Sequence, residues 1–179
     1  EFRRVLFRSD AGIETVRLDL PSGEEAKRLE VIGTAASTLA RAGVERGDLI
    51  VAIGGGALTD AAGMLAATYL RGIDWIAMPT TLAGQLDASL GGKTGVDLPE
   101  GKNLLGAFHQ PRAVIADLRA LRSLPAREIV AALGEAVKVA MLGDERLFAL
   151  LESAADRLAI AESSVHDDGT LAEIVERAG

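Results

Sequence analysis

Three consecutive glycines between two apolar segments limit how this chain can fold more than any other feature. Residues 48–53 (DLIVAI) are a short apolar run, typical of a strand buried in a parallel sheet, and Gly54, Gly55 and Gly56 follow it directly. Helical spacing then resumes over residues 57–70. Such a turn either lets a dinucleotide's pyrophosphate approach the backbone at the start of the helix, or simply packs helix against strand. The triple glycine alone leaves both interpretations open.

The flanking segments alternate between strand and helix patterns. Residues 14–20 (ETVRLDL) alternate apolar and polar side chains, which predicts a strand. Residues 74–78 (DWIAM) and 113–115 predict two more buried strands. A helix is expected over residues 24–42, ended by a left-handed Gly43. Its apolar face comprises Leu29, Ile32, Ala36, Leu39 and Ala40.

This alternation predicts an α/β fold with a partial Rossmann-like parallel sheet over residues 10–117. Residues 118–179 show helical periodicity without a strand pattern, and we expect them to begin an all-helical domain. Pro125 is placed to start a helix, with Ser123 or Leu124 near its cap, and Asp144 is placed to cap the next one. Another helix is expected from residue 171.

Composition excludes several classes of protein. The net charge is −7 and there is no basic stripe, so no nucleic-acid partner is expected. The apolar runs are too short to span a bilayer, so no membrane partner is expected either. The chain has no cysteine, which excludes disulfides and thiolate metal sites and fits a cytoplasmic protein. Residues 1–9 (EFRRVLFRS) are basic and begin with Glu-Phe, as a common cloning site encodes, and we interpret them as a cloning or library remnant.

Residues 79–110 concentrate polar side chains among glycines. Thr80 and Thr81 follow a predicted strand at the ligand-binding end of the sheet, and Lys93 and Lys102 each stand next to a glycine. Two lysines there predict a local phosphate site in an acidic protein. A solvated loop with unrelated charges is the alternative interpretation. The other polar residues of the segment are Asp87, Ser89, Thr94 and Asn103.

Glu135 and Lys138 lie one turn apart on a predicted helix among small apolar residues. Such a spacing usually means a solvated ion pair, but an apolar setting favours a buried carboxylate whose partner is Lys138 or a metal ion. The two histidines, His109 and His166, have no metal-ligand spacing with each other or with Glu135. No complete zinc site can therefore be recognised in this chain.

These signals occur in the order and approximate spacing of the dehydroquinate synthase family, zinc- and NAD-dependent sugar-phosphate cyclases of the shikimate pathway. GGGALTD resembles that family's G-G-G-V-x-G-D loop, and LPSGEEAK resembles its P-D-G-E-x-x-K. PTTLAGQLDASLGGKTGVDLPEGKNLLGAFHQP closely resembles its long lysine- and asparagine-bearing signature, and LPAREIVAALGEAVK its L-P-x-R-E-x-x-x-G-x-A-E-x-x-K. The resemblance runs from about residue 21 to about residue 151.

The resemblance implies a role for each matching position. Residues around the substrate would be Asp87, Lys93, Asn103 and Lys138, and Arg71 would be donated across a homodimer interface. Glu135 would be the first zinc (or cobalt) ligand of a metal-binding helical domain. The residues that would hold NAD are Glu24, Lys27, Gly54, Gly55, Gly56, Ala57, Leu58, Thr59, Asp60, Thr80, Thr81, Lys93, Lys102, Ala120, Leu121, Arg122 and Ser123.

Some positions depart from the family pattern. Thr59 stands where glycine is usual, Ser22 replaces an aspartate, and Asp97-Leu98 replaces the more usual Asn-His. The family's two zinc-binding histidines belong to a downstream segment that this chain does not contain, and its first strand–helix unit is also missing. We therefore expect an internal fragment with an incomplete zinc site, catalytically inactive in isolation.

The implied activity converts 3-deoxy-D-arabino-heptulosonate 7-phosphate to 3-dehydroquinate and phosphate, with NAD transiently reduced. Three alternatives remain at this point. One is a related cyclase that makes 2-deoxy-scyllo-inosose or epi-valiolone. Another is a metal-dependent polyol dehydrogenase of the glycerol type, which would produce net NADH. The third is a fragment that acts at most as a weak NAD-binding module.

Overall fold

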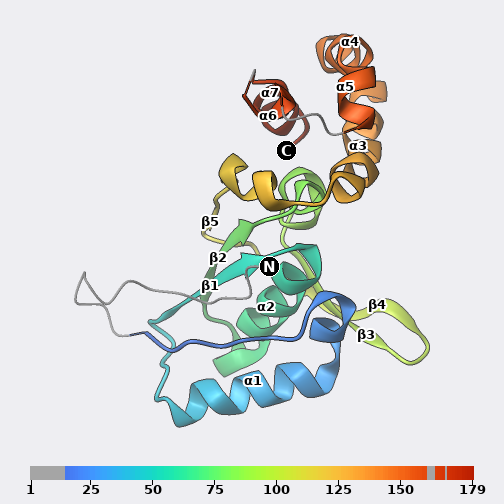
Figure 1. Cartoon of the computed structure of the whole chain (residues 1–179). Helices are drawn as coiled ribbons and strands as arrows, with labels where there is room; N and C mark the ends of the chain where they lie inside the picture. The colour runs from blue at the N-terminus through green and yellow to red at the C-terminus, as the bar shows by residue number, and fades with distance from the viewer. Residues whose placement is uncertain (1–14, 161–163, 168) are drawn as a thin grey trace.

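The computed structural model describes residues 15–160, 164–167 and 169–179. The predicted remnant at residues 1–9 lies outside this range. Two groups of buried residues form separate hydrophobic clusters, one in an α/β layer and one among the helices of the second half (Figure 1). The second cluster also takes in Leu82 and Leu86, which precede residue 118. The predicted domain division at residue 117 stays a prediction.

The parallel sheet is present as expected. Strands β1 (Leu49–Gly54), β2 (Asp74–Pro79) and β5 (Ala113–Val114) pair in the order β1-β2-β5, and both pairings are parallel. Helix α2 (Gly56–Thr68) starts directly beyond β1 and packs on the sheet, and helix α1 (Leu29–Arg41) packs on α2. Gly43 has a φ of 75°, so the left-handed end predicted for the first helix is confirmed.

The N-terminal elements differ from the prediction. Residues 15–20 form no strand, although Leu18 and Leu20 are buried and the polar Arg17 and Asp19 are exposed. The predicted helix over residues 24–42 is interrupted. A short 3₁₀ helix, η2 (Gly23–Lys27), ends at Arg28, which is extended (φ −77°, ψ 138°) and bridges to Asp97 before α1 begins. The buried face of α1 comprises Ile32, Ala35 and Leu39. Leu29 and Ala40, which were predicted to belong to this face, are exposed.

A β-hairpin that the sequence did not predict is inserted between strands β2 and β5 of the sheet. Strands β3 (Lys93–Leu98) and β4 (Gly101–Phe108) pair antiparallel and project from the α/β layer (Figure 1). Before them, a π-helical turn, η4 (Gly84–Ala88), follows β2. β3 packs on α2. The hairpin therefore covers part of α2, and Thr94 lies against Gly63 in the middle of this helix.

The second half is helical, as predicted. Its first segment is the 3₁₀ helix η5 (Leu118–Ser123), followed by the long helix α3 (Ala126–Met141), for which Pro125 is the N-cap residue. Asp144 caps α4, because its Oδ1 accepts a hydrogen bond of 2.9 Å from the Leu147 amide. The remaining helices are α4 (Glu145–Ser153), α5 (Ala155–Ala159), α6 (Ser164–Asp167) and α7 (Thr170–Ala178).

Candidate active site

The glycine turn opens onto a cleft of about 870 Å³. α2 begins at Gly56 without a side-chain cap, so its first backbone amides are available to an anionic ligand. A side chain would be crowded at two of the glycines. A Cβ on Gly56 would lie 2.9 Å from the Ala88 Cβ, and one on Gly55 would lie 3.1 Å from the Thr81 Cγ2. The geometry fits a pyrophosphate-binding loop.

About half of the residues predicted to hold NAD line this cleft. They come from η2, from the turn into α2, from the end of β2 and from the end of η5: Glu24, Gly55, Gly56, Ala57, Leu58, Thr80, Thr81 and Ser123. The opposite wall was missed by sequence reasoning, and it comes from residues 21–23, from Ala83 and from Leu124, Pro125, Arg127 and Glu128 at the start of α3. The L-P-x-R-E motif was the available signal for this wall.

The other predicted NAD residues have different surroundings. Gly54 is buried, and its carbonyl oxygen accepts a hydrogen bond of 2.8 Å from the Thr80 amide. Thr59 is buried and donates to the Gly56 carbonyl over 2.9 Å. Leu121 belongs to the helical core, and Arg122 pairs with Asp167. Ala120, which precedes Leu121 on η5, is not part of the cleft wall. Lys27, Lys93, Lys102 and Asp60 contact charged side chains.

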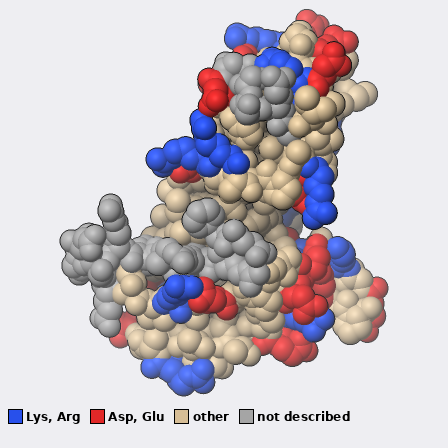
Figure 2. Space-filling model, in the orientation of Figure 1, with Lys and Arg blue, Asp and Glu red and all other residues tan. Residues whose placement is uncertain are grey.

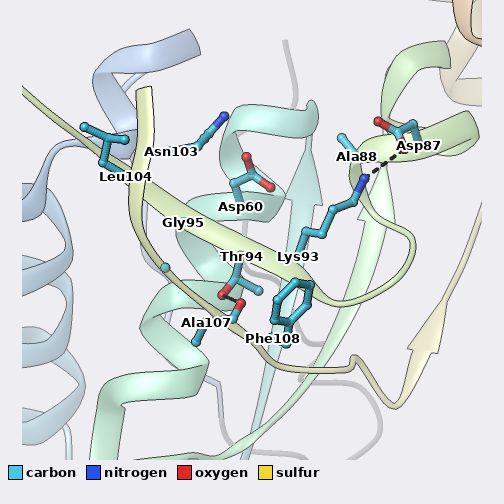
Figure 3. Close-up of a pocket in the computed structure, with 11 residues that line it drawn as sticks. Asp60, Asp87, Ala88, Lys93, Thr94, Gly95, Asn103, Leu104, Ala107 and Phe108 are labelled. Carbon is cyan, nitrogen blue, oxygen red and sulfur yellow. Dashed lines mark hydrogen bonds and ion pairs between the residues drawn. The ribbon is translucent and has the colours of Figure 1, made fainter. Parts of the chain in front are cut away.

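A second pocket, of about 580 Å³, is lined by residues of α2, η4 and the hairpin (Figure 3). Asp60 enters it from α2, Asp87 from η4, Lys93 from β3 and Asn103 from β4. Lys93 Nζ lies 2.9 Å from Asp87 Oδ1, and both side chains are about half exposed. Leu104, Ala107 and Phe108 provide apolar wall. Three of the four predicted substrate residues thus meet in one cavity.

Lys27 donates hydrogen bonds to two residues that line this charged pocket, Asp60 and Asn103. The Lys27 Nζ donates to Asp60 Oδ2 over 2.7 Å and also to Asn103 Oδ1. Burial raises the pKa of Asp60, and the hydrogen bond and charge of Lys27 partly oppose this rise. At the edge of the cleft, Lys102 Nζ lies 3.0 Å from Glu24 Oε1, with both side chains exposed.

The fourth predicted substrate residue, Lys138, pairs with Glu135 on α3. The Glu135 side chain is 39% exposed, which fits the solvated ion pair and not the buried carboxylate. Its role as a metal ligand stays a prediction. The neighbouring Ala132, Ala136 and Ala140 face the core instead. The pKa of Lys138 is raised, chiefly by Glu135, and Asp87 contributes at longer range.

Oppositely charged groups therefore alternate along the site. The charge of Lys93 lowers the pKa of Asp60, and Lys93 forms an ion pair with Asp87. The charge of Asp87 in turn raises the pKa of Lys138. Charges of both signs are also interleaved where the hairpin leaves the α/β layer (Figure 2). An array of this kind can bind a polyanion by exchanging carboxylate partners for ligand oxygens.

No metal site is complete within the described residues. They include no group of three or more His, Cys, Asp or Glu side chains arranged to hold an ion. Glu135 can supply one carboxylate. His109 is structural, since its Nε2 lies 2.8 Å from the Ile73 carbonyl oxygen and its own carbonyl accepts from Trp75 Nε1. His166, left unassigned by the sequence, is half-buried on α6.

Arg71 does not join the other predicted residues. It is exposed, has a φ of 65°, and follows the C-terminal end of α2, whereas the glycine turn lies at the N-terminal end. Its donation to a partner subunit stays a prediction. None of the helices in the described part of the chain is long and apolar enough to cross a membrane.

An open parallel sheet with a glycine cleft at its carboxyl edge defines an α/β protein of the nucleotide-binding class. Solved structures under 25% identical, including a probable glycerol dehydrogenase from Sinorhizobium meliloti (19%, TM-score 0.63, covering 88% of this chain and 48% of that one), share this fold. The model of the 3-dehydroquinate synthase N-terminal domain matches residues 17–131, and the chain belongs to that family.

Individual relatives support this assignment. The 3-dehydroquinate synthase of Mycolicibacterium gilvum is 48% identical over 171 residues, which cover 95% of this chain and 46% of the relative. That of Symbiobacterium thermophilum is 51% identical over 142 residues, covering 79% and 40%. The chain thus spans less than half the length of these relatives.

Two solved cyclase structures are also similar. A 2-epi-5-epi-valiolone synthase from Streptomyces hygroscopicus with NAD⁺ and Zn²⁺ bound has a TM-score of 0.78 and is 34% identical, covering 88% of this chain and 44% of that one. A 2-deoxy-scyllo-inosose synthase complexed with carbaglucose-6-phosphate, NAD⁺ and Co²⁺ has a TM-score of 0.63 and is 39% identical, covering 66% and 32%.

Proposed function

We propose that the full-length protein carrying this chain is a 3-dehydroquinate synthase, a carbon–oxygen lyase of the shikimate pathway. It would convert 3-deoxy-D-arabino-heptulosonate 7-phosphate to 3-dehydroquinate and phosphate, with NAD⁺ and a divalent metal ion. The observation that supports this most is the charged array of Asp87, Lys93 and Lys138, in a structure that also has the glycine cleft. Helix α2 would then contribute to both sites, through residues 56–58 in the cofactor cleft and Asp60 in the phosphate-binding pocket.

The cleft residues would bind and orient the nucleotide. The first amides of α2 would donate to its pyrophosphate, and Thr80 and Thr81 would contact it from the end of β2. Bound NAD⁺ supplies transient hydride acceptance, which makes the neighbouring carbon–hydrogen bond of the substrate acidic.

The lysines would bind the anionic substrate. Lys93 can move from Asp87 to a substrate phosphate or carboxylate because both side chains of this pair are solvent-accessible and lie in the pocket. Lys138 would act in the same way from α3, with Glu135 as its present partner. Such charge-assisted contacts stabilise negative charge that develops during elimination and ring closure.

Glu135 would be one ligand of the metal ion, in keeping with the Zn²⁺ and Co²⁺ in the related cyclase structures. The described residues supply no complete set of ligands, so the other ligands would lie elsewhere in the full-length protein. A homodimer in which Arg71 reaches the partner's site completes the proposal.

The test is an assay of the purified full-length protein with the heptulosonate phosphate, NAD⁺ and Zn²⁺ or Co²⁺. We expect equimolar release of phosphate and 3-dehydroquinate without net NADH. Phosphate release should cease when a chelator removes the metal ion and should return when Co²⁺ is added. Net accumulation of NADH would instead indicate a dehydrogenase, and the cyclase proposal would fail.

A second candidate is a related cyclase, favoured by the TM-score of 0.78 to the valiolone synthase. The same assay distinguishes the two if the sugar phosphates of the related cyclases are offered in parallel. One of these is glucose 6-phosphate, whose carba analogue occupies the deoxy-inosose synthase structure. Turnover of one of these sugars alone would favour the second candidate.

A further inference from the structure

The turn that follows α2 contains three consecutive residues with positive φ. Leu70, Arg71 and Gly72 have φ values of 50°, 65° and 116°. Glycine adopts such a backbone conformation without steric cost, whereas Leu70 and Arg71 lose free energy in it. A left-handed glycine is the usual way to end a helix, and this chain has one after α1, at Gly43. The need to end α2 therefore does not explain a leucine and an arginine at these positions.

Arg71 also differs from the other arginines in its lack of partners. It is exposed, and its side chain forms no hydrogen bond or ion pair with any residue that the structure describes. Every other arginine in the described part of the chain interacts with at least one of its groups. Backbone strain of this kind persists mainly at functional positions. The strained, unpaired guanidinium therefore indicates a binding partner beyond these residues.

Two side chains connect the turn to the loop between α1 and β1. The hydroxyl of Tyr69, a residue that is 9% exposed, donates to the Val44 carbonyl oxygen over 2.8 Å. Arg46 Nη2 donates to the Leu70 carbonyl oxygen over 2.7 Å. These hydrogen bonds hold the residue immediately before the turn and the first residue of the turn.

The backbone beyond Arg71 is held as well. The Gly72 amide donates to the Tyr69 carbonyl oxygen, and the Ile73 amide donates to the Ala66 carbonyl oxygen, each over 2.9 Å. The Ile73 carbonyl oxygen lies 2.8 Å from His109 Nε2. Arg71 thus stands between two anchored segments, which limits the directions in which its side chain can extend.

We propose that Tyr69 and Arg46 are positioning residues, which hold the left-handed turn of residues 70–72 and so present Arg71 to an anionic group of the substrate in the partner's site. This inference rests on the proposed function, in which Arg71 reaches that site. A guanidinium binds carboxylate or phosphate through two parallel hydrogen bonds, so its orientation matters. Tyr69 and Arg46 would act on the substrate only through Arg71.

The experiment is a double-mutant cycle on the turnover of the full-length protein. Tyr69→Phe/Arg46→Met removes both hydrogen bonds and keeps the aromatic ring. We expect kcat to fall about tenfold, because the turn loses two bonds, and Arg71→Ala to lower kcat by at least as much. Arg41→Met is the matched control and should turn over like wild type, because the exposed Arg41 donates only to Thr38, one turn away on α1.

Combining the changes separates a positioning role from a purely structural one. If Tyr69 and Arg46 act through Arg71, adding their changes to Arg71→Ala should leave kcat within about twofold of Arg71→Ala alone. Losses that multiply would overturn the proposal, as would wild-type turnover in Tyr69→Phe/Arg46→Met or in Arg71→Ala. Arg46→Met alone protects the test against misfolding, since this side chain is exposed, and it should lower kcat about threefold.

Amide hydrogen exchange of the full-length protein tests the turn independently of activity. The Gly72 and Ile73 amides should exchange about tenfold faster in Tyr69→Phe/Arg46→Met than in wild type or Arg41→Met. The amides of β1 are the reference for global opening and should be unchanged. Equal exchange at Gly72 and Ile73 would contradict the proposal. Should wild type show no cyclase turnover, the proposed function fails, and faster exchange in the variant would still show that Tyr69 and Arg46 hold the turn.

Discussion

The two helices that carry the candidate site are packed in different ways. α2 is buried on most sides, because the sheet, α1 and the hairpin all pack against it. α3 buries one row, Ile129, Ala132, Ala136 and Ala140, and exposes Val130, Val137 and Met141. A helix enclosed on most sides tolerates little change in side-chain volume, whereas a helix packed on one side tolerates change on the other.

The same contrast applies to the charged groups on these helices. Asp60 on α2 is held by a buried lysine, and its pKa is raised by burial. Glu135 and Lys138 on α3 form an exposed pair. α2 thus presents a fixed surface to a ligand, and α3 presents side chains that can change partners. Lys93 links the charged groups of the two helices, because its charge acts on the pKa of Asp60 and it pairs with Asp87, whose charge acts on the pKa of Lys138.

The largest effect is expected from removing that link. Lys93→Ala in the full-length protein should reduce kcat about 100-fold, as does the loss of one donor that stabilises developing negative charge. The side chain is 54% exposed, so folding should be unaffected. Steady-state turnover is the measurement. Arg112→Ala is the control, since Arg112 pairs with Asp74 away from both cavities. Near-normal turnover of Lys93→Ala would exclude Lys93 from the reaction.

A smaller effect is expected at the start of α2. Gly56→Ala places a Cβ 2.9 Å from the Ala88 Cβ, which forces the first turn of the helix to shift. The Kd of NAD⁺ should rise about tenfold, equivalent to about 1.4 kcal/mol, because the pyrophosphate loses the aligned amides. Isothermal titration of the full-length protein measures this. Gly47→Ala, with open space around its Cβ, should leave Kd unchanged. An unchanged Kd in Gly56→Ala would mean that the pyrophosphate binds elsewhere.

The sequence predicted the α2 side of the site better than the α3 side, for a physical reason. A glycine turn between a buried strand and a helix is a local pattern, so β1, α2 and the cleft could be predicted from neighbouring residues. The hairpin depends on pairing between Lys93 and Phe108, which local periodicity does not report. A turn signal was available at residues 99–101 (PEG), between two extended runs.

Exposure on α3 was harder to predict than its helical state. The alanines around Glu135 indicated an apolar setting, but only one row of them faces the core. The break at Arg28 was also unpredictable, because Arg28 bridges to Asp97, which is distant in sequence. Lys27 shows the same difficulty, since its three partners come from segments that only the folded chain brings together.

The next prediction tests the enclosure of α2 through stability. A Cβ on Gly63 would lie 2.4 Å from the Thr94 Cγ2 and 3.0 Å from the ring of Trp75. Neither neighbour can move freely, because the Thr94 hydroxyl donates to the Ala107 carbonyl and the Trp75 indole donates to the His109 carbonyl. Gly63→Ala should therefore lower the free energy of unfolding by about 1–3 kcal/mol.

Denaturant unfolding of this chain measures that change. Thr94→Ser supplies a sharper comparison, because it keeps the hydroxyl and removes the methyl group that would clash. In the double variant Gly63→Ala/Thr94→Ser, much of the lost stability should return. A double variant as unstable as the sum of the two single changes would show that this contact does not limit α2.

The smallest effect is the opposite change on α3. Gly134 lies in the middle of this helix with no atom within 4 Å of an added Cβ. Gly134→Ala should raise the free energy of unfolding of this chain by about 0.5–1 kcal/mol, because alanine loses less backbone entropy in a helix. Gly33→Ala on α1, which is equally open, should give a similar gain. If Gly134→Ala destabilises the chain while Gly33→Ala stabilises it, then the outer face of α3 is covered in solution, and the contrast between the two helices is smaller than the structure indicates.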